Sequence, residues 1–162
     1  MDLPKRKSIR LKEYDYSQNG YYFITLCVQN RKHIFETENV GNDLCVVPQN
    51  RIIHNRLKDT ENKFGIRIDK YVIMPDHIHM ILNIEYQKTD HSVPDIMRWF
   101  KTMTTNDYIK GVNSKGFQPF DKKLWQKSYY EHIIRNVADY QEVWQYIDGN
   151  PSRKVELKDN SR

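Results

Sequence analysis

The most informative segment of this chain is Tyr71-Val72-Ile73-Met74-Pro75-Asp76-His77-Ile78-His79-Met80-Ile81-Leu82. It consists of two apolar runs separated by Pro75-Asp76, a pair typical of a tight turn between strands. The segment therefore predicts a β-hairpin, with one strand over 66–74 and the next over 77–85.

Two histidines occupy alternate positions at the start of the second predicted strand. Successive side chains of a strand face opposite sides, so His77 and His79 share one face while Ile78 and Met80 pack on the other. Neutral imidazoles bind divalent metals such as Mg, Mn or Zn, and a pair leaves room for substrate and a third protein ligand. A His-x-His pair alone is more often an ordinary half-buried pair, so the metal interpretation needs a second element elsewhere in the chain.

Length and charge limit the classes of protein that fit. With 162 residues the chain predicts one domain, over 1–151, followed by a flexible polar tail over 152–162. The formal net charge of +5 favours a polyanionic partner. No secretory signal and no membrane-spanning run is recognised, so we expect a cytoplasmic protein without a membrane partner. Cys27 and Cys45 form no C-x-x-C pair, which argues against a disulfide framework or zinc knuckle.

The remaining elements follow from hydrophobic periodicity and from turn residues. Strands are predicted over 21–28 and 124–135, and helices over 48–65, 93–108 and 137–149. The order strand, helix, strand, strand, helix, strand, helix is that of a ferredoxin-like α+β fold (βαββαβ) with an added C-terminal helix. In this arrangement helices cover one face of an antiparallel sheet, and we expect His77 and His79 on the open face.

The last predicted helix carries a tyrosine away from its apolar stripe. The stripe is formed by Tyr140, Val143, Trp144 and Ile147. Tyr146 falls roughly 110° from the centre of this stripe, and Asn150 lies one turn further on the same side. A lone tyrosine at such an edge is usually a boundary residue that reaches water. Together with the histidine pair, however, this helix supplies a nucleophile to a candidate metal site.

The reaction that suits these residues is transfer of a phosphodiester onto tyrosine. Only about one tyrosine in a thousand is ionised at pH 7, because its ordinary pKa is about 10. A metal that withdraws electron density from the scissile phosphate compensates for this weak nucleophile. Phenolate is also a better leaving group than an alkoxide, so the linkage is reversible and suits strand transfer.

Several motifs together resemble a known family. Met74-Pro75-Asp76-His77-Ile78-His79 resembles the HUH motif of single-strand DNA endonucleases, and Tyr146-x-x-x-Asn150-Pro151 resembles the tyrosine helix of their single-tyrosine branch. Three further segments are similar to the REP-associated tyrosine transposases: Arg6 to Tyr16, Tyr22-Phe23-Ile24-Thr25 and Leu124 to Asn136. The resemblance extends from about Arg6 to Pro151.

This resemblance implies a metal-dependent single-stranded DNA endonuclease and strand transferase that acts at hairpin DNA of repetitive extragenic palindromes. It implies that His77, His79 and Asn150 bind Mg or Mn, and that Tyr146 becomes joined to the 5′-phosphate. The protein would be a monomer or a homodimer. Many relatives have Asn where this chain has Asp76, and mobile relatives usually have Gln in place of Asn150.

Two other classes of protein compete with this interpretation. Histidine-triad hydrolases need His-x-His-x-His, and the third position here is Ile81. A non-catalytic ferredoxin-like module that binds nucleic acid through sheet aromatics is the alternative function. It lacks its usual Lys/Arg-Gly-aromatic run here, and it does not explain Tyr146 with Asn150.

Basic and aromatic side chains are expected around the open face, where they would bind DNA with a steep salt dependence. The candidates are Arg10, Arg98, Lys101, Trp125, Lys127 and Arg135. Arg135 follows a predicted strand and is equally compatible with a structural ion pair.

Overall fold

The structure is a computed structural model that describes residues 19–37, 47–85 and 90–159, with side chains described as far as Asn150. The predicted contact residue Arg10 and the second cysteine, Cys45, lie outside these ranges. The secondary-structure elements of the protein, in chain order, are β1 (Gly20–Cys27), the 3-10 turn η1 (Gln29–Arg31), α1 (Pro48–Phe64), β2 (Arg67–Met74), β3 (His77–Ile84), α2 (Val93–Lys115), β4 (Tyr130–Ile134) and α3 (Val137–Asp159). None of the helices in these ranges combines the length and apolarity needed to cross a bilayer.

The four strands form one antiparallel sheet in the order β2-β3-β1-β4. This order and the element sequence confirm the predicted ferredoxin-like α+β fold. β2 and β3 form the predicted hairpin, in which Met74 pairs with His77 across the turn. β1 lies on the other side of β3, so that Cys27 is opposite His77 and Thr25 is opposite His79.

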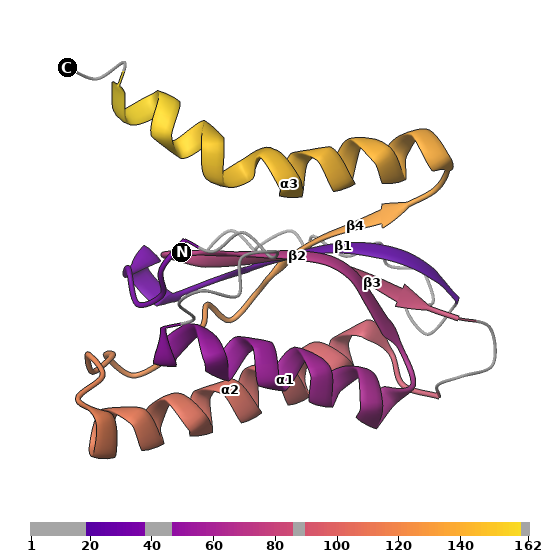
Figure 1. Cartoon of the computed structure of the whole chain (residues 1–162). Coiled ribbons are helices and arrows are strands. Elements are labelled where there is room, and N and C mark those ends of the chain that lie inside the picture. Colours follow the sequence, from indigo (N-terminus) through magenta and orange to yellow (C-terminus); the bar gives the residue numbers. More distant parts are fainter. Residues whose placement is uncertain (1–18, 38–46, 86–89, 160–162) are drawn as a thin grey trace, which may run out of the picture.

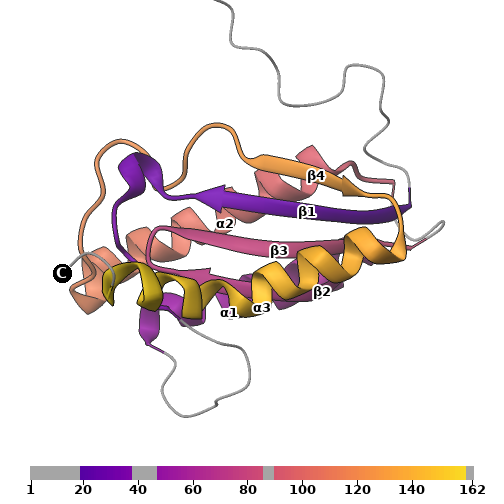
Figure 2. The ribbon, with the colours of Figure 1, turned by 90° about the horizontal axis from the view of Figure 1, so that it is seen from above.

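The helices form two layers, one on each face of the sheet. Figure 1 shows α1 and α2 side by side below the sheet and α3 above it. The larger core lies between the sheet and α1 and α2, and includes Tyr22, Ile24, Ile78 and Met80. A smaller core beneath α3 includes Phe23, Val72, Ile81, Val143 and Ile147. The expectation that the histidines lie on an open face is wrong, because α3 lies across β2 and β3 on that face (Figure 2).

The helix ends follow from local sequence. Gly65 ends α1 in the left-handed conformation, with φ 64°. Ser92 and Asp95 form a capping box at the start of α2. The helix predicted over 93–108 is too short, since α2 continues to Lys115. Glycine is needed at position 111 for packing, because a Cβ there would collide with the Phe117 ring.

Two predicted boundaries near the C-terminus also differ. β4 is shorter than the predicted strand over 124–135, because Lys101 Nζ binds the carbonyl oxygens of Gln126 (2.8 Å) and Lys127 (3.0 Å). Only one isolated bridge, Val28 to Trp125, extends the pairing. α3 continues past Gly149 and Pro151 to Asp159. A proline within a helix removes one hydrogen bond and favours a bend, but the residues that follow it are good helix formers.

Candidate active site

The two histidines lie together on the face of the sheet that α3 covers. Their ring centroids are 4.6 Å apart, and their residues are only 6% (His77) and 5% (His79) exposed. Ile78 and Met80 point into the core on the other side, as the strand alternation predicted. The strand therefore fixes two imidazoles beside one another in a largely dry environment.

His79 is held by the neighbouring strand. Its Nδ1 atom is 2.7 Å from Thr25 Oγ1, and its ring is 5.4 Å from that of Phe23. Burial, the adjacent His77 and the charge of Arg31 lower the pKa of His79 to about 3. The ring is therefore neutral at physiological pH, which is the form that binds metals. If His79 Nδ1 carries the proton and donates it to Thr25, Nε2 is the ring nitrogen left to accept a ligand.

His77 is held by the carboxylate that precedes it. Its Nδ1 atom is 2.6 Å from Asp76 Oδ1. A carboxylate that accepts the Nδ1 proton makes Nε2 the more basic ring nitrogen, as in carboxylate-histidine-metal sites. The second carboxylate oxygen, Oδ2, is 3.0 Å from Arg31 Nε. Arg31, Asp76 and His77 thus form a continuous chain of polar contacts.

Tyr146 projects from α3 beside the histidine pair. Its ring centroid is 5.3 Å from that of His79 and 6.0 Å from that of Phe23. The residue is 38% exposed, so it borders the buried imidazoles while keeping contact with solvent. This placement agrees with the prediction that Tyr146 lies off the apolar stripe.

Asn150 is 8% exposed on the same helix, which places an amide in the covered layer. The described residues contain no cluster of three or more His, Cys, Asp or Glu side chains suited to a metal ion. A metal at the histidine pair therefore needs a ligand of another type. The side chain of Asn150 is a candidate for that ligand, because an amide oxygen can coordinate a divalent ion.

The apolar stripe of α3 differs in part from the prediction. Val143 and Ile147 are buried, but Trp144 is 37% exposed. Its ring instead lies beneath Lys70, whose Nζ is 3.9 Å from the ring centroid. A tryptophan at the edge of a packed layer can bind a cation on the face of its ring instead of being fully buried.

The other nearby tyrosines occupy different environments. Tyr140 donates its hydroxyl to Asp69 at 3.1 Å, and burial together with that carboxylate raises its pKa to about 12. Tyr129 is 9% exposed in the larger core, whereas Tyr130 is 49% exposed and packs against Phe23. Tyr140, with its raised pKa and tied hydroxyl, is a poor nucleophile.

A hydrogen-bonded contact that sequence reasoning missed holds the start of α3 against the sheet. His132 Nε2 lies 2.9 Å from both carboxylate oxygens of Asp139, and the Arg135 backbone N–H donates to the same carboxylate at 3.2 Å. His132 is on β4 and Asp139 is in the first turn of α3. The contact fixes where the helix enters the layer above the histidines.

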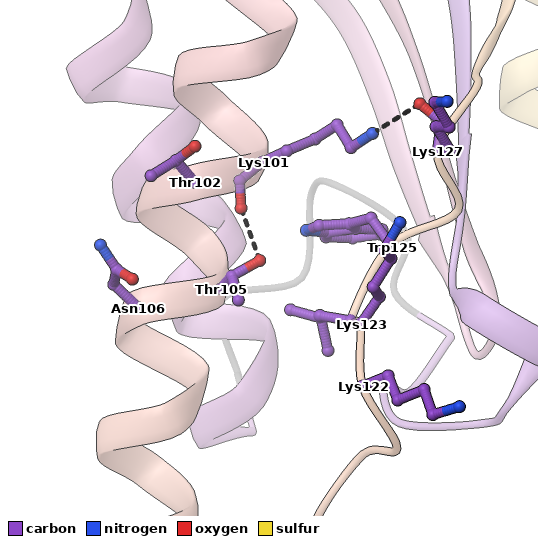
Figure 3. A pocket seen from close by; sticks show the side chains of 9 residues that line it. Lys101, Thr102, Thr105, Asn106, Lys122, Lys123, Trp125 and Lys127 are labelled. Carbon is purple, nitrogen blue, oxygen red and sulfur yellow. Dashed lines mark hydrogen bonds between the residues drawn. The ribbon is translucent and has the colours of Figure 1, made fainter.

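Three of the predicted DNA-contacting side chains that the structure describes lie close together. Lys101, Trp125 and Lys127 line a pocket between α2 and the segment before β4 (Figure 3). Trp125 is 3% exposed, stacks on Phe35 and donates its indole N–H to Thr104 at 2.9 Å. It is a core residue, so its expected place on an open face is wrong.

The other predicted contacts are spread along the molecule. Lys101 is tied to backbone carbonyls, whereas the Arg98 side chain is 75% exposed on α2. Arg135 is exposed between β4 and α3.

The fold and the histidine face together define a class: a ferredoxin-like domain whose sheet carries a His-x-His pair beneath a tyrosine-bearing helix. Comparison with known families gives the same answer, because residues 16–150 match the family described as IS200-like transposase. The chain belongs to this family. Its resemblance to the REP-associated tyrosine transposases is likewise confirmed.

Individual relatives cover most of the chain. An uncharacterized protein of Haemophilus influenzae is 34% identical over 170 residues, which cover 90% of this chain and 88% of that protein. The REP-associated tyrosine transposase of Escherichia coli K12 is 24% identical over 136 residues, which cover 84% of this chain and 68% of that protein. A solved structure of a REP-associated tyrosine transposase bound to a REP hairpin has a TM-score of 0.63 at 21% identity, covering 90% of this chain and 73% of that one.

Proposed function

We propose that this transposase-family protein is a metal-dependent single-stranded DNA endonuclease and strand transferase that forms a 5′-phosphotyrosine intermediate through Tyr146. The observation that carries the proposal is the 5.3 Å separation between the rings of Tyr146 and His79. It brings a half-exposed nucleophile to a pair of buried imidazoles that are already oriented. The two histidines belong to β3 within the sheet, and Tyr146 belongs to α3, which packs on it.

The proposed reaction is a transesterification. The phenolic oxygen of Tyr146 attacks the phosphorus, and a bond from phosphorus to the tyrosine oxygen forms. The bond to the 3′ oxygen breaks, and that oxygen takes up a proton to become a free 3′-hydroxyl. The phenol proton leaves to water, to which Tyr146 is partly open. Attack by a 3′-hydroxyl on the phosphotyrosine reverses these steps and joins strands.

The metal site of this proposal consists of His77, His79 and Asn150. A divalent ion, Mg or Mn, when bound there, would polarise the scissile phosphate as a Lewis acid. Thr25 and Asp76 hold the imidazoles in fixed orientations, so that little reorganisation is needed on binding. α3 limits the access of water to the histidines.

The proposed substrate is single-stranded DNA folded as a hairpin of the REP type. The structural relative at 0.63 TM-score is described as bound to a REP hairpin, which supports a DNA partner for this chain. The net charge of +5 is consistent with that partner. The predicted cytoplasmic location and the choice between monomer and homodimer stay predictions.

The alternative, a non-catalytic module that stacks bases on sheet aromatics, has less support. Stacking of that kind requires an open sheet face. Here α3 lies over the face that carries Phe23, and Phe23 is 8% exposed. A plain binding module also gives no role to the oriented histidine pair.

The test is incubation with end-labelled hairpin DNA and Mg or Mn, followed by denaturing electrophoresis. The proposal predicts a protein-DNA adduct that survives denaturation and depends on the metal. His77→Ala is expected to abolish it. The matched control is His91→Ala, because His91 is exposed and contacts Phe64 in the α1 and α2 layer. Unchanged cleavage by His77→Ala would refute the site.

A further inference from the structure

The segment that follows β1 carries an arginine to the edge of the histidine site. η1 contains two successive non-glycine residues in the left-handed region, Asn30 (φ 58°) and Arg31 (φ 55°). This conformation is uncommon for non-glycine residues and is disfavoured for a long side chain. Such backbone persists where the surrounding structure imposes it, and it clusters at functional sites.

The surrounding structure does impose it, through the turn of the histidine hairpin. The Val28 N–H donates to the Asp76 carbonyl at 2.9 Å, and the N–H groups of Ile34 and Phe35 donate to the Pro75 carbonyl at 3.0 and 3.1 Å. Ile34 and Phe35 are buried in the larger core. Residues 28–35 are thus anchored on both sides of Arg31 to the turn that leads into His77.

Only part of the Arg31 guanidinium is used by the protein. Nε lies 3.0 Å from Asp76 Oδ2, and Nη1 contacts Sγ of Cys27, the residue paired with His77 in the sheet. The Arg31 side chain remains 50% exposed, whereas that of Asp76 is 8% exposed. No hydrogen bond to Nη2 is found among the described residues. Two of the three guanidinium nitrogens are therefore held by the protein, and the half-exposed side chain keeps Nη2 as a further donor.

An arginine that is held in place and keeps an unused Nη2 donor is suited to a phosphate oxygen. Arginine is favoured at such positions because its planar, permanently charged fork donates several oriented hydrogen bonds. We propose that Arg31 is a phosphate-binding residue, whose guanidinium contacts a non-bridging oxygen of the DNA backbone at or next to the phosphodiester that Tyr146 attacks. This inference rests on the proposed function, and it adds a substrate contact that the His-x-His and tyrosine motifs do not include.

A purely structural role would give Arg31 one task, to balance the buried charge of Asp76. The two roles differ in what they predict for DNA. A charge-balancing arginine affects binding only through the fold, so removing both charges together restores it. A phosphate contact contributes to the salt dependence of binding, and this contribution is lost with the arginine whatever residue occupies position 76.

The experiment measures binding of a fluorescein-labelled hairpin oligonucleotide with a single-stranded flank, by anisotropy in EDTA at several salt concentrations. Arg31→Ala is expected to weaken binding about tenfold or more. It is also expected to reduce the slope of log K against log salt by about 0.7, the value for one contact to a single strand. Arg67→Ala is the matched control, because Arg67 is exposed and paired with Glu85 at the opposite end of β2.

A second variant, Arg31→Ala with Asp76→Asn, separates the two roles. Continued weak binding and a reduced salt slope in the double variant support the phosphate contact. Wild-type affinity and slope in the double variant, or in Arg31→Ala itself, would overturn it. These binding measurements need neither metal nor cleavage, so they are independent of the proposed reaction. If the wild-type protein formed no phosphotyrosine but Arg31→Ala still weakened DNA binding, the Arg31 contact would be supported and only the reaction refuted.

Discussion

The ring of Tyr146 on α3 lies 5.3 Å from the ring of His79 on β3, although 67 positions separate the two residues in the chain. Two cores create this proximity. Ile78 and Met80 anchor β3 from below, and Val143 and Ile147 anchor α3 from above. The proximity of the tyrosine and imidazole rings is therefore a product of packing on both faces of the sheet.

Thr25 is expected to control metal affinity through His79. Thr25→Val keeps the side-chain shape but removes the partner of His79 Nδ1. Loss of such an orienting contact typically weakens metal binding about 10–100-fold. Calorimetric titration with Mn is the measurement, and Thr25→Ser, which keeps the hydroxyl, is the control. Equal affinity in the valine and serine variants would contradict this role.

The metal-free protein is expected to lose stability on mild acidification. His79 has its pKa lowered from 6.5 to about 3 in the fold. Between these values the unfolded state binds the proton and the folded state does not, so stability falls as the pH is lowered. From about pH 7 to about pH 5 the loss is about 2 kcal/mol from this one residue. Urea unfolding in EDTA is the measurement.

The matched variant for this pH effect is His79→Gln, which cannot titrate. Its unfolding free energy is expected to change less than that of the wild type over the same interval. The carboxylate of Asp139 does not affect this comparison. Hydrogen bonding to His132 lowers the pKa of Asp139 below 3.8, so the contribution of Asp139 to stability is lost only at a pH below this interval. Parallel pH profiles for wild type and variant would show that His79 is not the responsible group.

Trp125 is expected to affect stability rather than DNA binding directly. Trp125→Ala removes a buried indole that stacks on Phe35 and bonds Thr104, and such truncations cost about 3–5 kcal/mol. Trp125→Phe keeps most of the ring volume and is expected to cost less. Urea midpoints measure both. If the Trp125→Phe protein had wild-type stability but bound hairpin DNA poorly, Trp125 would be a DNA-contacting residue and this prediction would be wrong.

Local patterns were sufficient for the hairpin and for its histidine face. Two apolar runs on either side of Pro75-Asp76 predict the hairpin, and the alternation of side chains along a strand then places His77 and His79 on one face. Tyr146 was found in the same way, from its angle to Val143 and Ile147. These are short-range properties of a strand and a helix.

The errors arose where long-range packing overrides local pattern. The sequence around Trp125 is rich in lysine and therefore predicts a surface aromatic residue. Its place in the core depends on a distant residue, Phe35, on which its ring stacks. α3 was expected to stop at Gly149, but it continues, and its packing covers the face expected to be open. Arg31 had no signal of its own, because a left-handed arginine after a strand cannot be recognised from neighbouring residue types.

The central claim is that Tyr146 becomes covalently joined to DNA, and the most direct measurement is peptide mapping of the adduct by mass spectrometry. The protein is incubated with hairpin DNA and Mn, the DNA is trimmed by nuclease, and the modified peptide is sequenced. We expect a 5′-phosphotyrosyl linkage at Tyr146, and none in Tyr146→Phe, which keeps the ring packing against Phe23 and should fold and bind DNA normally. A nucleotide attached to Tyr129, Tyr130 or Tyr140, or an adduct that persists in Tyr146→Phe, would contradict the account.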